Sequence, residues 1–148
     1  MELQDLSPSS KVWIYKSDRQ MSSGEQFEIR AALNEFIPTW AAHGSSLFGA
    51  ADIVKDWFVV LAVDESQVYA SGCSIDSSVK FMRETGAKFN LDFFDRMHVL
   101  VEKNGEIQNI HFNEIGNYND WKIYDPMTGS LEEYNANWLV NISESRFA

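Results

Sequence analysis

The pattern of apolar and polar side chains predicts a strand and then a helix at the start of the chain. Residues 11–16 hold four consecutive β-prone side chains without helical periodicity, which is typical of a short strand that is apolar on both faces. Ser22 and Glu25 form a capping-box pattern, and the apolar residues that follow recur at the spacing of one helix face. We therefore expect an amphipathic helix over residues 23–43, which kinks at Pro38 or finishes there as a separate turn because proline lacks a backbone donor.

The middle of the chain predicts a hairpin and a second helix. A weak strand over residues 47–54 precedes an uninterrupted apolar run over residues 57–63, which is short, β-branched and typical of a central strand buried on both faces. Lys55-Asp56 stands between them and is expected to close a hairpin. Over residues 75–88 the apolar positions return to helical spacing, with Asp76 in the first turn, where the helix dipole favours an acid.

The last third of the chain predicts a second hairpin and a further pair of strands. Residues 97–103 and 106–112 flank Asn104-Gly105, the dipeptide best suited to a type I′ turn. Residues 115–148 carry aromatic side chains on both sides of a turn at 125–129, which is typical of two more strands.

This order of elements predicts an α+β fold, namely a ferredoxin-like split βαβ sandwich with an added edge hairpin and a C-terminal β extension. Both helices would lie on one face of a single antiparallel sheet that contains the strands near residues 12, 60 and 99. Two of those strands are apolar on both faces, so the helix-free face also needs cover. We expect residues 121–138, a second subunit in a homodimer, or both, to supply it.

Composition and charge narrow the class of protein. A chain of 148 residues with 45% hydrophobic residues is large and apolar enough for one core, so we expect a single domain over residues 11–148 after a flexible polar tail over residues 1–10. A net charge of −10 disfavours nucleic acid and membrane surfaces as partners. The sequence shows no membrane helix or signal peptide, and its one cysteine, Cys73, fits a reducing compartment, so we expect a soluble, cytoplasmic protein.

Three short strings carry a resemblance to an uncharacterised bacterial family. They are Lys-Val-Trp-Ile-Tyr at residues 11–15, Leu-Ala-Val-Asp-Glu at 61–65 and Ser-Gly-Cys-Ser-Ile-Asp-Ser-Ser at 71–78. Some relatives in that family carry a label as transporter ATPases, an activity that needs a Gly-x4-Gly-Lys-Ser/Thr loop to cradle phosphate. Here the nearest match, Gly44 to Gly49, is followed by two alanines, so the resemblance implies no ATPase activity, no catalytic residue and no cofactor.

The segment from Ser71 to Ser78 is the strongest candidate for ligand binding. If Ser74 or Cys73 caps the second helix, unpaired backbone N–H groups and nearby hydroxyls gather there and form an anion site. Asp76 opposes this, because its carboxylate repels an anion. The candidate ligand-binding residues are Ser71, Gly72, Ser74, Ser77 and Ser78.

Cys73 is the candidate nucleophile, because a helix N-terminus lowers the pKa of a thiol. His43 and Asp64 would complete a Cys-His-Asp arrangement if the fold brought the three side chains together. In the other interpretation, Cys73 fills space at the helix start, where Asp76 and burial keep the thiol protonated. The leading hypothesis is a small non-enzymatic module that binds a small molecule or a protein partner, and the alternative is a thiol-dependent enzyme using Cys73.

The second hairpin pairs two histidines. With Asn104-Gly105 as its loop, His98 faces His111 directly across the strands, on one face of the hairpin. Two imidazoles hold a metal ion only with further ligands, and the sequence shows no third ligand nearby. We therefore expect a polar sheet face and no metal.

Overall fold

Two separate antiparallel sheets form the framework of the fold. The computed structural model describes residues 2–42, 45–46, 48–64 and 72–148. In chain order the elements are η1 (Leu3–Asp5), β1 (Lys11–Lys16), α1 (Ser23–Thr39), β2 (Ala41–Ala42), β3 (Ser45–Ser46), β4 (Phe48–Val54), β5 (Phe58–Asp64), α2 (Gly72–Phe89), β6 (His98–Lys103), β7 (Glu106–His111), η2 (Phe112–Tyr118), β8 (Lys122–Tyr124), α3 (Leu131–Asn137), β9 (Leu139–Asn141) and η3 (Ile142–Glu144). The strand order is β1-β5-β4 in the first sheet and β7-β6-β8-β9 in the second, and β2 and β3 form a short pair of their own.

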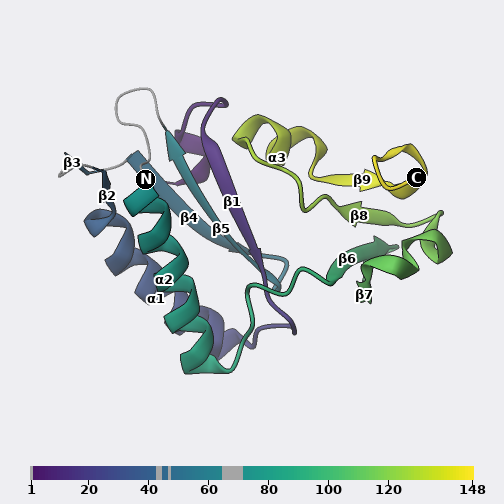
Figure 1. The fold of residues 1–148 in the computed structure, drawn as a ribbon, viewed down its shortest axis with the longest axis horizontal. Helices are drawn as coiled ribbons and strands as arrows, with labels where there is room; N and C mark the ends of the chain where they lie inside the picture. The colour runs from purple at the N-terminus through teal and green to yellow at the C-terminus, as the bar shows by residue number, and fades with distance from the viewer. Residues whose placement is uncertain (1, 43–44, 47, 65–71) are drawn as a thin grey trace.

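The first sheet carries both long helices on one face (Figure 1). Its central strand is β5, in which every side chain from Phe58 to Val63 is buried, as the uninterrupted apolar run predicts. Val59, Leu61 and Val63 point toward the helices and pack in one cluster with side chains of α1 and α2. The predicted hairpin before β5 is confirmed, because Lys55 and Asp56 both take positive φ angles, 58° and 63°, and turn the chain without glycine.

The helix-free face of the first sheet is covered by the C-terminal part of the same chain. Phe58, Val60 and Ala62 form a cluster there with Tyr124, Leu131 and Trp138, so the predicted cover over residues 121–138 is confirmed. Trp121 differs from this expectation, because it packs on the far side of the second sheet. The N-terminal segment also differs from the flexible tail that its polarity predicts: η1 brings Leu3 and Leu6 into the same cluster.

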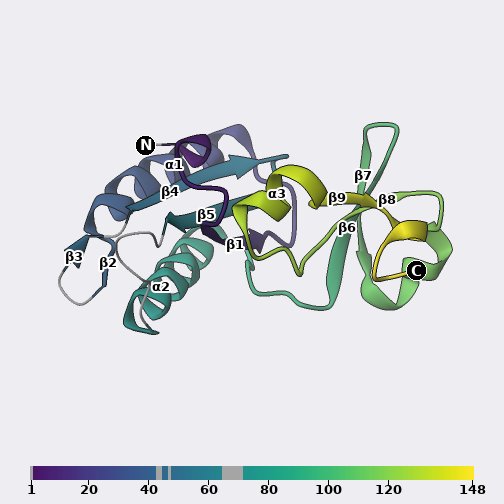
Figure 2. The ribbon, with the colours of Figure 1, turned by 90° about the horizontal axis from the view of Figure 1, so that it is seen from above.

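The α+β class is confirmed, but the prediction of a single ferredoxin-like sheet was wrong. The strand near residue 99, β6, lies in the second sheet, which stands at the opposite end of the molecule from the two long helices (Figure 2). The physical reason is that β6 is apolar on both faces, with Val99 and Val101 in one cluster and Leu100 in another. Its two edges pair with β7 and β8, so a C-terminal strand takes the place beside β6 that the single sheet gives to a strand of the first sheet.

The second hairpin has the predicted register. His98 pairs with His111, and Asn104 and Gly105 both take positive φ angles, as a type I′ turn requires. The predicted C-terminal strands are β8 and β9, which pair antiparallel. Between them the chain forms α3, which begins at a Ser130 cap whose side chain accepts the Glu133 N–H. The sequence pattern does not predict this helix, because seven residues are too few to show helical periodicity.

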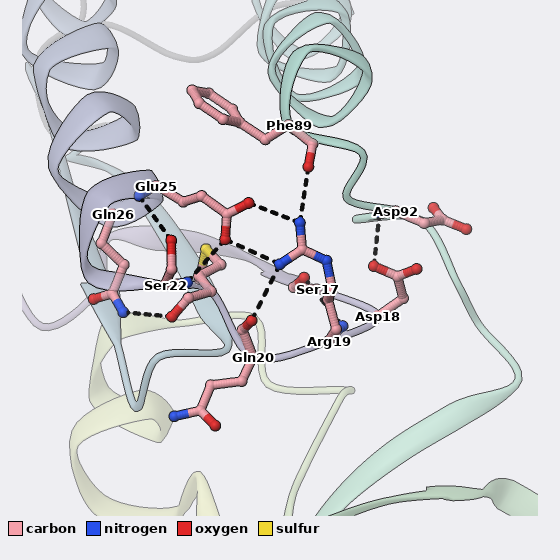
Figure 3. Close-up of polar contacts among 10 residues, drawn as sticks. Ser17, Asp18, Arg19, Gln20, Ser22, Glu25, Gln26, Phe89 and Asp92 are labelled. Atoms are coloured by element: carbon pink, nitrogen blue, oxygen red, sulfur yellow. Dashed lines mark hydrogen bonds and ion pairs between the residues drawn. The ribbon is translucent and has the colours of Figure 1, made fainter.

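A polar network joins the start of α1 to the end of α2 (Figure 3). Ser22 and Glu25 form the predicted capping box of α1, which ends at Thr39, one residue after Pro38. The Arg19 guanidinium donates to both carboxylate oxygens of Glu25, at 3.0 and 2.7 Å, and to the backbone carbonyl of Phe89 at 2.8 Å. One arginine therefore holds a helix start against a helix end.

Replacing Glu25 with glutamine is expected to lower the free energy of unfolding at pH 7 by about 0.5–1.5 kcal/mol. The hydrogen bond from Arg19 and the capping bonds hold the pKa of Glu25 at about 2, below its unfolded value of 4.5. Its stabilisation is therefore present above pH 4.5 and is lost as the pH falls toward 2. Urea unfolding at several pH values checks this: the stability difference between wild type and variant should shrink across that range, and a difference independent of pH would contradict it.

Candidate functional site

The structure brings the predicted site residues together only in part. His43 and Ser71 lie outside the described residues, so the predicted Cys-His-Asp arrangement is not placed. The α2 helix begins at Gly72, so Cys73 lies at the start of the helix, as expected, and both Cys73 and Ser74 fall inside its first turn instead of at the cap position. The helical pattern gave no sign of the extra turn, because small and polar residues precede its first apolar position.

The other predicted residues have internal partners. Asp64 ends β5 and accepts the Ser7 N–H at 3.3 Å. Ser78 is fully buried, and its hydroxyl donates to the carbonyl of Ile75 at 2.7 Å. Ser77 is exposed on α2.

The paired histidines sit side by side with ring centroids 5.5 Å apart. The His98 Nδ1 atom lies 2.8 Å from the Asp95 carboxylate, while the His111 Nδ1 atom accepts the Asn113 N–H. In the part of the chain that the structure describes, no group of three histidine, cysteine or acidic side chains is placed to hold a metal ion.

A groove of about 620 Å³ lies where the first sheet meets the second, and sequence analysis missed it. Its floor is β1, the strand at the edge of the first sheet that faces the second sheet (Figure 1). One wall comes from the first turns of α2 and the connection over residues 93–98, and the other from residues 124–128 and Trp138. Its volume falls within the range of ligand sites, and its lining is mostly apolar and aromatic, as is usual for such sites.

The floor of the groove exposes unpaired backbone. The Val12 N–H points away from β5, because it donates to the Gly129 carbonyl at 3.2 Å. Alternate residues of a strand direct their N–H and C=O groups to the same side, so Ile14 and Lys16 also present theirs to the groove. Among the described residues, no hydrogen bond meets these two backbone positions from the groove side.

Lys16, Asp95, His98 and Arg96 are four of the polar side chains that line the groove. Lys16 donates to the Ser17 carbonyl and to Asn109 Oδ1, and burial lowers its pKa although Asp95 opposes this. Burial would raise the pKa of Asp95, but the bonds from the Met97 N–H and from His98 bring it below its usual value. Arg96, the fourth, is exposed and makes no ion pair among the described residues.

Both rims of the groove expose apolar side chains. Ile75, at the start of α2, is 36% exposed, and Met127, in the loop after β8, is 63% exposed. The loop that carries Met127 is held by Asp125, whose carboxylate accepts the Met127 N–H at 2.8 Å and pairs with the Arg146 Nε at 3.0 Å. The rim therefore exposes apolar side chains, and the polar contacts of Asp125 hold the loop that carries Met127 in place.

Comparison with family models, with curated protein sequences and with solved structures finds no match to this chain. The resemblance to an uncharacterised bacterial family therefore stays a prediction. None of the described helices is long and apolar enough to cross a membrane.

Proposed function

We propose that the protein is a cytoplasmic, non-enzymatic binding module that takes a segment of a protein partner in the groove along β1. The observation that carries this proposal is an unpaired strand edge at the floor of an apolar groove. Exposed sheet edges with pockets on both sides are a recurring means of binding peptides.

The chemistry of the lining supports a protein segment over a phosphorylated metabolite or nucleic acid. Aromatic side chains such as Trp13, Phe94 and Trp138 form a large part of the lining, and such side chains bury the apolar side chains of a peptide well. The net charge of −10 repels polyanions, which disfavours nucleic acid as the natural occupant.

Peptides selected from a displayed random library against the immobilised protein are expected to lose at least about tenfold in affinity to an Ile75→Glu variant. Ile75 is an exposed rim residue, so a carboxylate there places a charge in the groove entrance without disturbing the core. Fluorescence anisotropy with the selected, synthesised peptides measures the change.

Phe27→Glu is the matched control, because Phe27 is 77% exposed on α1 and does not line the groove. This variant should bind the selected peptides as the wild type does. Selection of no binding peptide, or equal binding to wild type and Ile75→Glu, would refute the groove as the site.

A further inference from the structure

We propose that the bound segment is an extended strand that adds to the open edge of β1, and that it carries one carboxylate side chain within an otherwise neutral or basic sequence. This inference rests on the proposed function and specifies its ligand. Three observations carry it: the direction of the free backbone groups of β1, the alternation of surfaces on its two sides, and the charges in the groove.

The chain itself begins the pairing that the ligand would complete. On the groove side of β1, the backbones of Lys11 and Ser130 form an isolated antiparallel β-bridge, and the Val12 N–H donates to the Gly129 carbonyl. Beyond these contacts, residues 124–128 turn away from β1 and line the groove. The next outward groups along β1 belong to Ile14 and Lys16. A second strand at this edge therefore meets a ladder that is already started and correctly spaced for antiparallel or parallel pairing.

The two faces of an added strand would meet different surroundings. On the helix side, the Trp13 and Tyr15 side chains and the Ile75 and Val79 side chains of α2 form an apolar surface. On the opposite side, Lys16 lines the groove beside Ile14, Phe58, Tyr124 and Trp138. Because side chains of a strand alternate between faces, the ligand should present apolar residues to the helix side and its carboxylate to the side that carries Lys16.

The charges in the groove select a single carboxylate. The Asp95 oxygens are occupied by the Met97 N–H and by His98, at 2.8 Å each, which leaves Arg96 as an exposed cation without an ion-pair partner among the described residues. Lys16 adds a second positive charge and the Asp95 carboxylate one negative charge, so Lys16, Arg96 and Asp95 together leave one net positive charge in the groove. The whole chain has a net charge of −10, so an acidic run would be repelled, while one carboxylate with basic flanks satisfies both the local and the long-range field.

A second copy of this chain fits the edge poorly. Val12 is already paired, and the Ser17 N–H turns inward to the Trp57 carbonyl, so the open stretch runs only from Trp13 to Lys16, roughly 13 Å of strand. Groove walls on both sides of this stretch admit a single extended segment more easily than the edge of another folded sheet. Two chains of charge −10 also repel each other.

The test uses an N-acetylated, C-amidated heptapeptide of sequence Lys-Val-Glu-Val-Thr-Val-Lys and amide hydrogen exchange of the full chain measured by NMR. In the free protein, the Ile14 and Lys16 amides should exchange fast, and those of Trp13 and Tyr15, which bond to β5, should exchange slowly. Bound peptide should slow Ile14 and Lys16 exchange at least about tenfold and leave Trp13 and Tyr15 unchanged.

Charge reversal tests the carboxylate. Arg96→Glu should weaken binding of this peptide at least about tenfold, and a peptide with lysine in place of its glutamate should bind that variant better than the wild type. Lys80→Glu is the matched control, since it makes the same change in net charge on an exposed part of α2 outside the groove, and it should have little effect.

The outcomes separate this inference from the proposed function. Peptide binding in the groove without slower exchange at Ile14 and Lys16 would overturn strand addition and leave a groove-binding module. Library-selected peptides that bind the groove while this heptapeptide fails to bind at about 1 mM would overturn the stated ligand chemistry. Failure of the library selection itself would remove the proposed function.

Discussion

Replacing Trp138 with alanine is expected to lower the free energy of unfolding by about 3–5 kcal/mol. Trp138 is only 8% exposed, and its ring contacts Phe58 at 4.7 Å, Tyr124 at 4.8 Å and Tyr134 at 4.9 Å between centroids. It therefore joins β5, β8 and α3, which belong to the first sheet, the second sheet and the C-terminal cover. Its removal opens a cavity at the point where these parts meet.

Chemical denaturation followed by far-ultraviolet circular dichroism measures this loss. Trp57→Ala is the matched control, because Trp57 is only partly buried beside the same cluster and should cost less than half as much. If the two variants were equally stable, the C-terminal segment would not be the cover that stabilises the helix-free face of the first sheet.

Gly86→Ala is expected to destabilise the protein by about 1–3 kcal/mol, although alanine is the better helix former by about 1 kcal/mol. A Cβ atom at Gly86 would overlap the backbone carbonyl oxygen of Leu91 and touch the Phe93 ring at 3.5 Å. The chain after α2 folds back closely here, with the Leu91 N–H donating to the Gly86 carbonyl at 2.8 Å. Backbone, unlike a flexible side-chain tip, cannot move aside cheaply.

The informative result is whether Gly86→Ala lowers or raises the stability, and thermal unfolding of this variant beside Gly24→Ala measures it. Gly24→Ala in the first turn of α1 meets no atom within 4 Å and should leave stability unchanged or raise it by up to about 1 kcal/mol. Stabilisation by Gly86→Ala as well would show that Leu91 does not pack against α2 in this way. The turn also leads into the 93–98 wall of the groove, so a shift there should weaken peptide binding.

The sequence predicted those elements whose signals are local. Asn104-Gly105 alone determined the register that pairs His98 with His111, because a two-residue turn leaves no freedom to slip. The capping box at Ser22 and the apolar run of β5 were equally direct. The need for a second cover on β5 followed from its apolar faces, and Trp138 meets it.

The assignment of strands to sheets was beyond local pattern. Both β5 and β6 are buried on two faces. An apolar strand pattern predicts that both faces are covered, but it does not identify the elements that cover them or the strands that pair with it. Val99 and Leu100 point to opposite faces of β6 and pack in different clusters, which only the folded arrangement reveals. The order of the elements is compatible with a single sheet, but the packing of the folded chain produces two sheets.

The groove was missed because its parts are far apart in the chain. Its floor comes from β1, its walls come from α2, the connection before β6 and the loop after β8, and no motif links these segments. The sequence drew attention instead to the serines around Cys73, where Ser78 proves to be fully buried. The sequence around Ile14 does not show that its strand lies at a sheet edge, because the same residues are equally typical of a central strand.

The most direct test of the groove as the binding site is chemical-shift mapping by ¹H–¹⁵N NMR with the library-selected peptides. The predicted result is that the largest shifts fall on residues 12–16, 93–98 and 125–128, the segments that surround the groove. Small or no shifts are expected over α1 and over the outer face of the second sheet around Trp121. The largest shifts on α1 or around Trp121, with residues 12–16 unaffected, would contradict the assignment of this groove as the binding site.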